Sequence, residues 1–342
     1  MYADFYKLSG KPFQLSPSPR FFYNSRGHRK ALDYLTYGLH QGEGFIVITG
    51  DIGTGKTTLV GYLLGQLDQT KYVAGKLVTT QVEADDTLRM IASAFGLETH
   101  GIDKATLLRR FEGFLLDNQR RGRRALMLVD ECQNLPIRSL EELRMLSNFQ
   151  LGDIPPIQFF LLGQPQFQAT LANDNLVQLR QRVIASYHLG PLNADETQAY
   201  IEHRLRQVNW NSDPAITADA YSQIHRFSAG VARQINTLCD RLLLHGMLEE
   251  LHQIDATIVE NVAREMFSEL KSATPAPTSP SISQPRSPKK TSRGGDYERL
   301  ERRVAAVEQL LLSHDKALRQ ALNLVMKYLI RESEERGEGE SK

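Results

Sequence analysis

The sequence predicts an α/β fold in which helices sandwich a parallel sheet and a small helical unit follows. Strand-like apolar runs alternate with helical patterns from about residue 44 to residue 190, and such alternation is typical of a parallel sheet with helices on both faces. Beyond Pro191 the apolar residues recur only at helical spacing. The 342 residues are enough for about two domains with a buried core.

The strands are predicted where short apolar runs are bounded by glycine or polar residues. They cover residues 45–49, 71–79, 125–130, 157–163 and 183–189. Helices are expected between them, because the apolar residues of the intervening segments recur every three or four positions. After the last strand, Asn193 and Glu196 have the spacing of a helix N-cap and its N3 partner, which predicts a helix to about residue 207. Two more amphipathic helices are expected at 230–248 and 256–270.

These elements divide the chain into five expected parts. They are an N-terminal arm with the first helix (1–43), an α/β core (44–190), a helical lid (191–271), a disordered linker (272–295) and a C-terminal helix (296–335). The linker is rich in Pro and Ser and cannot bury enough apolar surface to order itself. Its four cations favour a solvated tract, with binding to anionic lipid or nucleic acid as the alternative.

The C-terminal helix has apolar residues spaced alternately four and three apart over about four heptads. This spacing favours a coiled coil that binds a second copy or a partner. The alternative is one amphipathic helix that folds back on the body of the protein.

The stretch GDIGTGKTT follows the first predicted strand and precedes a helix expected at 58–67. Its pattern G-x-x-x-x-G-K-[ST] is typical of a P-loop, whose backbone N–H groups surround a polyphosphate. Lys56 would neutralise the β- and γ-phosphates of ATP, and the Thr57 hydroxyl would bind Mg²⁺. The alternative is a glycine turn between a strand and a helix. The expected nucleotide-binding residues are Gly50, Asp51, Ile52, Gly53, Thr54, Gly55, Lys56, Thr57 and Thr58.

The run ALMLVDE places two carboxylates at the end of a predicted buried strand. Asp130 is expected to hold Mg²⁺ and Glu131 to orient the water that attacks the γ-phosphate. The alternative is a solvated acidic edge. A P-loop about seventy-five residues upstream favours ATP hydrolysis. A kinase would require an acceptor site, for which the sequence gives no indication.

The charge balance and the apolar runs limit the class of protein. Lys and Arg number 41 and Asp and Glu number 40, which argues against a nucleic-acid footprint over the whole chain. The N-terminus lacks the basic flank and apolar stretch of a signal peptide, and no run is long enough to span a membrane. Two dispersed cysteines fit a reducing compartment. We therefore expect a cytoplasmic protein, with peripheral association at the inner membrane as a variant of this prediction.

The four motifs GDIGTGKTT, LMLVDE, LLGQP and GVARQIN together resemble the AAA+ ATPases of the general secretion pathway A type, the ExeA-like secretion ATPases. The N-terminal run from FYKLSGKPF to GFIVITG is most similar to the subfamily associated with the exosortase/PEP-CTERM system and exopolysaccharide export. The resemblance covers about residues 1–270. It implies a homo-oligomer at the cytoplasmic face of an envelope export complex. Longer members continue into a membrane span and a peptidoglycan-binding domain, whose function we do not expect here.

The resemblance also implies roles for four side chains beyond the two phosphate-binding motifs. Gln164 matches the sensor-1 residue that responds to the γ-phosphate, although a turn residue would also fit. Arg182, or else Arg180, matches the arginine finger that a neighbouring subunit inserts, although two arginines on a helix also fit a solvated face. Arg233 matches the sensor-2 arginine of the lid. His28 occupies a position from which the family allows contact with the nucleotide, but its spacing favours a solvated helix start.

Two functional classes follow from these predictions. The first is a Mg²⁺-dependent ATPase that energises or regulates a cell-envelope export system. The second is a DNA-associated AAA+ regulator of transposition or replication initiation. The first is favoured because no winged-helix or helix-turn-helix pattern follows the lid.

Overall fold

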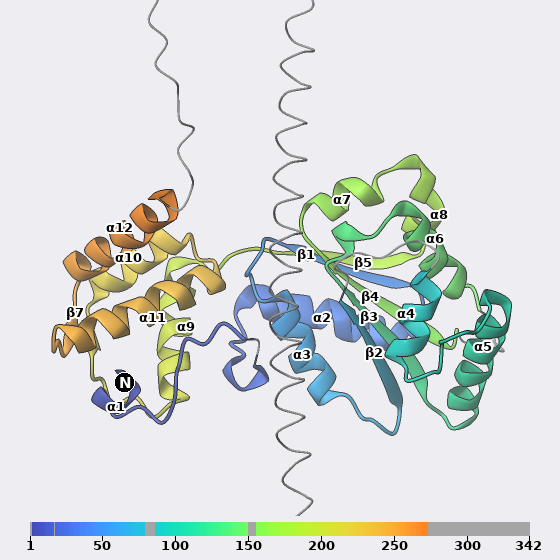
Figure 1. Cartoon of the computed structure of the whole chain (residues 1–342), viewed down its shortest axis with the longest axis horizontal. Helices are drawn as coiled ribbons and strands as arrows, with labels where there is room; N and C mark the ends of the chain where they lie inside the picture. The colour runs from blue at the N-terminus through green and yellow to red at the C-terminus, as the bar shows by residue number, and fades with distance from the viewer. Residues whose placement is uncertain (1, 17, 79–85, 150–154, 273–342) are drawn as a thin grey trace, which may run out of the picture. The chain divides into compact units, whose positions relative to one another are not determined.

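The computed structural model describes residues 2–16, 18–78, 86–149 and 155–272 (Figure 1). These residues lie within one compact unit, Met1–Pro275. The predicted linker at 272–295 and the predicted terminal helix at 296–335 lie outside the described residues, apart from Ser272, which ends the last helix. None of the helices in the described ranges combines the length and the apolar character needed to cross a membrane.

Five parallel strands form the central sheet in the order β2-β3-β4-β1-β5. Each predicted strand is confirmed within two residues, and the bounds are β1 Phe45–Gly50, β2 Tyr72–Val78, β3 Arg124–Asp130, β4 Ile157–Gly163 and β5 Val183–Leu189. After β1 the chain crosses β4 and β3 to reach the edge of the sheet. Because β1 lies where the strand order reverses, the crevice beyond its carboxyl end is the expected ligand site of such a sheet.

Helices cover both faces of this sheet, as predicted. Ile46 and Ile48 of β1 pack against one layer, and Phe45 and Val47, which alternate with them, pack against the other. The first layer contains α2 Arg26–Gln41 and α3 Lys56–Gln66. The second contains α4 Thr87–Ala94, α5 Lys104–Arg120, η3 Cys132–Asn134, α6 Ile137–Leu146, α7 Gln166–Leu171, η4 Asp174–Leu176 and α8 Val177–Arg180. The two layers bury β1 completely.

Four helices form the lid (Figure 1), and their buried side chains share a second core. They are α9 Ala194–Arg206, α10 Ala218–Ser228, α11 Ala232–Leu248 and α12 Ala256–Ser272, with a short parallel pair β6 Ala215–Ile216 and β7 Gln253–Ile254. The predicted capping box is present at the start of α9, where the Glu196 N–H donates to Asn193 Oδ1 over 2.8 Å. This cap fixes the point at which the sheet gives way to the lid.

The N-terminal arm is packed along the lid by its aromatic residues. It contains α1 Tyr2–Phe5 and the short helix η1 Pro19–Phe21. Tyr6 and Phe13 are buried in the lid core. The buried guanidinium of Arg204 donates to the Pro12 carbonyl over 2.6 Å and lies 4.7 Å from the centre of the Phe21 ring. The arm therefore reaches from the lid to the first helix of the core.

Candidate functional site

The P-loop forms the turn between β1 and α3, and two of its glycines are required by geometry. Gly53 and Gly55 have φ of 87° and 99°, which side chains other than glycine rarely adopt. A Cβ on Gly53 would lie 2.5 Å from Cβ of Arg233, and a Cβ on Gly55 would lie 2.9 Å from His28 Nε2. Gly55 is the N-cap of α3, so the helix directs its N-terminal N–H groups at the loop.

Lys56 is buried at the start of α3. Its ammonium donates to the Gly50 carbonyl over 2.7 Å and to the Asp51 carbonyl over 3.0 Å. Burial lowers the pKa of this ammonium, whereas the carboxylates of Glu131, Asp130 and Asp51 act in the opposite direction. The cation is thus held over the loop, within reach of an anionic ligand.

Thr57, at the start of α3, meets Asp130, at the end of β3, although β4 lies between β3 and the strand β1 that leads to α3. The Thr57 hydroxyl donates to Asp130 Oδ2 over 2.8 Å. A hydroxyl and a carboxylate oxygen are hard ligands of the kind that Mg²⁺ prefers, and Mg²⁺ commonly takes its other ligands from water and phosphate. The pair therefore fits a Mg²⁺ ion that also contacts a bound polyphosphate.

Glu131 follows directly and has an unusual backbone, with φ 56° and ψ 40°. Its Oε2 accepts from Gln133 Nε2 over 2.5 Å and from Gln164 Nε2 over 3.3 Å. Gln133 Oε1 in turn accepts from the backbone N–H of Gln164 over 2.9 Å. Gln133 therefore connects the ends of β3 and β4 and fixes the Glu131 carboxylate. No sequence motif predicted this role, and its position two residues after Glu131 is the one feature of the sequence that indicates it.

Replacing Gln133 by Ala is expected to lower the ATP turnover number about tenfold to a hundredfold, while the Kd for ATP stays unchanged. Hydrogen bonds to a charged group contribute about 1.5–3 kcal/mol, and here they hold Glu131 rather than ATP. Turnover and equilibrium ATP binding would be measured side by side. Gln166→Ala, at an exposed position on α7, is the control, and an unchanged turnover number in Gln133→Ala would refute the positioning role.

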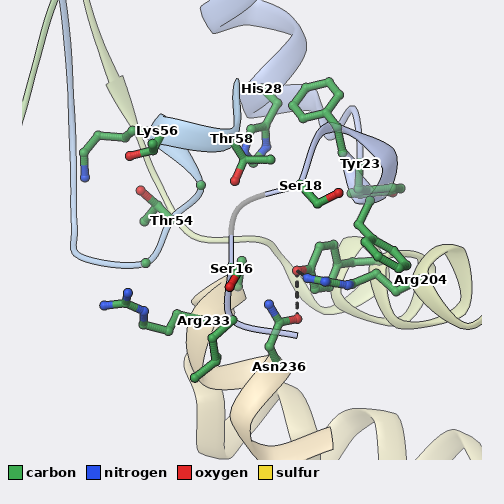
Figure 2. A pocket seen from close by; sticks show the side chains of 18 of the residues that line it. Ser16, Ser18, Tyr23, His28, Thr54, Lys56, Thr58, Arg204, Arg233 and Asn236 are labelled. Atoms are coloured by element: carbon green, nitrogen blue, oxygen red, sulfur yellow. Dashed lines mark hydrogen bonds between the residues drawn. The ribbon is translucent and has the colours of Figure 1, made fainter. Parts of the chain in front are cut away.

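The pocket beside the P-loop is shared by the core, the arm and the lid. It encloses about 980 Å³ including its solvent-open part. Figure 2 shows Thr54 and Lys56 on one side and Arg204 and Asn236, from the lid, on the other. The Arg233 N–H donates to the Gly53 carbonyl over 3.0 Å, so the start of α11 touches the loop. The exposed Arg233 side chain lines the same pocket as the P-loop.

The prediction that His28 begins a solvated helix is wrong. Ser25 is the N-cap of α2, and His28 is buried with its Nδ1 2.7 Å from the Ser25 hydroxyl. Burial lowers the pKa of His28 to about 4, so the ring is neutral at pH 7. The reason for the error is tertiary, because the P-loop packs over this turn and Gly55 leaves room for the ring.

The two candidate finger arginines lie apart from the P-loop of their own chain. The Arg182 carbonyl accepts from the N–H of Phe45, the first residue of β1, whereas the P-loop leaves the last residue of β1. Six strand residues separate these ends by about 17 Å. Arg182 Nη1 donates to the Ser147 carbonyl over 3.1 Å, whereas Arg180 is exposed and donates to the Leu171 carbonyl over 3.2 Å.

Comparison with known proteins agrees with this arrangement. A family model described as an AAA domain matches residues 39–171, which include the P-loop, Asp130, Glu131 and Gln164. The chain has the P-loop AAA+ fold. Cdc6p from Pyrobaculum aerophilum is similar, with a TM-score of 0.59 and 16% identity, over 74% of this chain and 70% of that one. The ORC1 protein of Aeropyrum pernix, solved in complex with DNA, gives a TM-score of 0.53 at 16% identity, over 74% and 69% of the two chains.

A curated relative gives a stronger indication of function. General secretion pathway protein A of Aeromonas hydrophila is 40% identical over 258 residues, which are 74% of this chain. The matched region spans 46% of the length of that relative. This similarity and the AAA domain support an AAA+ ATPase of the ExeA-like type.

Proposed function

We propose that this chain is a Mg²⁺-dependent ATPase that energises or regulates a cell-envelope export system. The proposal rests chiefly on one arrangement, in which Lys56 and Thr57, after β1, lie close to Asp130 and Glu131, at the end of β3. Its cellular setting rests on the 40% identity to General secretion pathway protein A.

In the proposed reaction, the P-loop N–H groups and Lys56 bind the phosphates of ATP. Thr57 and Asp130 would hold Mg²⁺, which would supply positive charge beside the phosphates. Glu131 orients a water molecule against the γ-phosphate, and the amides of Gln133 and Gln164 keep its carboxylate in place. Arg233 supplies a second cation from the lid, which couples the lid to the state of the nucleotide.

The finer assignment is to the exosortase/PEP-CTERM type of system and exopolysaccharide export. It is supported by the N-terminal run, which forms the arm and α2 around the pocket. In this proposal the ATPase works as a homo-oligomer in the cytoplasm, at the inner face of the export complex and peripheral to the inner membrane.

Steady-state ATP hydrolysis by the purified protein tests the proposal, measured with and without Mg²⁺ and double-stranded DNA at low and moderate salt. The expected result is hydrolysis that requires Mg²⁺ and whose rate is the same with and without DNA. Stimulation by DNA that fades with salt would favour the DNA-associated regulator, because binding to the phosphate backbone weakens steeply with salt. An absence of hydrolysis would contradict both functions.

Arg182 is expected to act in the site of a neighbouring subunit, so Arg182→Ala should lose most turnover at every protein concentration. Fingers of this kind contribute about 10³–10⁵ in turnover. A mixture of Arg182→Ala with Lys56→Ala should regain activity, because hybrid assemblies pair an intact P-loop with an intact arginine. Arg180→Ala is the matched variant, and rescue of Arg180→Ala but not of Arg182→Ala would transfer the role to Arg180.

A further inference from the structure

Asn236 is a buried polar residue of the pocket whose amide nitrogen has no partner among the residues that the structure describes. It lies on α11 one turn after Arg233 and is 7% exposed. Its Oδ1 accepts from the Tyr200 hydroxyl over 2.9 Å. Figure 2 shows the Asn236 oxygen turned toward this hydroxyl and the nitrogen turned away from it, into the pocket. Within the described ranges, Nδ2 forms no hydrogen bond.

The orientation of this amide is fixed by the direction of a hydrogen-bond chain. The Arg204 guanidinium contains only donors, and its Nη1 donates to the Tyr200 oxygen over 2.7 Å. Burial raises the pKa of Tyr200, so its hydroxyl keeps the proton that it donates to Asn236. The acceptor in Asn236 must therefore be its oxygen, and both hydrogens of its amide nitrogen remain for another group.

The arm in turn fixes Arg204, so the first residue of the hydrogen-bond chain from Arg204 through Tyr200 to Asn236 is held in place. It donates to the carbonyls of Pro12 and Gln14 and packs on the Phe21 ring. The Asn236 amide nitrogen faces the pocket, so a ligand acceptor would gain a hydrogen bond from a donor whose direction is already fixed. The pocket offers space for such a ligand beside Asn236.

The surroundings of Asn236 indicate which part of a nucleotide this donor meets. The P-loop, which binds phosphate in our proposal, is touched by the residue one helical turn earlier, Arg233. Aromatic side chains line the part of the pocket formed by the arm and α9, namely Phe21, Phe22, Tyr23 and Tyr200. Flat rings favour contact with a planar aromatic ligand. A purine base would present ring nitrogens as acceptors along its edge.

We propose that Asn236 binds the base of the nucleotide by donating from Nδ2 to a ring nitrogen, and that Tyr200 and Arg204 are positioning residues that fix its amide. This inference rests on the proposed ATP site and adds a residue that reads the base. Because the donor is fixed, the contact requires an unprotonated ring nitrogen in the ligand.

The test measures equilibrium binding of ATP, of 1-deaza-, 3-deaza- and 7-deaza-ATP, and of inorganic triphosphate. One deaza analogue should bind wild-type protein about three- to tenfold more weakly than ATP, as expected for one lost hydrogen bond. Asn236→Asp keeps the acceptor for Tyr200, lacks the donor and adds a negative charge, whose repulsion of the phosphates is measured with inorganic triphosphate. Relative to triphosphate, this variant should bind ATP about as weakly as wild type binds that analogue, and it should bind ATP and the analogue equally.

Triphosphate separates loss of base recognition from loss of the phosphate site. Triphosphate affinity should be equal in wild type and Tyr200→Phe, and in Asn236→Asp it should fall only by the repulsion from the added carboxylate. Tyr200→Phe should nevertheless weaken ATP binding, because the Asn236 amide is no longer fixed. An unchanged ATP affinity in Asn236→Asp, or the same deaza profile as wild type, would overturn the inference while leaving the ATP site intact. Failure of wild-type protein to bind either ATP or triphosphate would overturn the proposed function as well.

Discussion

Glu131→Gln is expected to bind ATP with wild-type affinity and to hydrolyse it about 10²–10⁴ times more slowly. The substitution keeps the shape of the side chain but removes the negative charge that orients and accepts a proton from water, and general bases contribute about this factor. Lys56, Thr57 and the loop that would bind the phosphates are untouched. Single-turnover hydrolysis and equilibrium binding, measured on the same preparation, separate the two effects.

The control for this variant is Glu249→Gln, which removes a carboxylate from an exposed position after α11. It should leave both binding and turnover unchanged. If Glu131→Gln hydrolysed ATP at the normal rate, the role given to Glu131 would be wrong, and the contacts with Gln133 and Gln164 would be structural only.

The sheet could be predicted because its three central strands, β1, β3 and β4, are nearly continuous apolar runs. Strands of a parallel sheet are buried on both faces, so the run 157–163 matches β4 at both ends. The order of the strands was not predictable in the same way. The strand order depends on where each helical connection returns to the sheet, and no local pattern indicates that β4 rather than β2 lies beside β1.

The candidate site could be predicted only where its residues are close in sequence. The loop and the pair Asp130–Glu131 are local patterns, and the contact of Thr57 with Asp130 follows from their positions at strand ends. Roles that depend on long-range packing were missed. His28 is buried because the P-loop covers it. The orientation of the Asn236 amide is fixed by residues of α9 and the arm.

A weak indication of Asn236 was nevertheless present in the motif GVARQIN. Residues three apart on a helix lie on one face, so a helix that directs Arg233 at the pocket also directs Asn236 toward it. The sequence could not show the direction of the hydrogen bonds. That direction comes from Arg204, which lies more than thirty residues earlier and is buried without a carboxylate partner among the described residues.

Lys56→Ala is expected to weaken ATP binding about tenfold to 150-fold and thereby to abolish turnover at ordinary ATP concentrations. The removed ammonium is the buried cation of the P-loop, and charge-assisted hydrogen bonds of this kind contribute about 1.5–3 kcal/mol. The effect on folding should be small by comparison. The Gly50 and Asp51 carbonyls lose a donor, but burying an ammonium is itself unfavourable, as the lowered pKa of Lys56 indicates.

Thermal unfolding with increasing ATP and Mg²⁺ measures both effects in one experiment. Ligand that binds only the folded state raises stability by RT ln(1 + [L]/Kd), so the midpoint of Lys56→Ala should begin to rise only at ATP concentrations about tenfold to 150-fold higher than those that raise the wild-type midpoint. Lys76→Ala, at an exposed position on β2, should behave like the wild type. A midpoint of Lys56→Ala that rises with ATP as the wild type does would show that the phosphates bind elsewhere, since no other buried cation of the described chain lies in this loop.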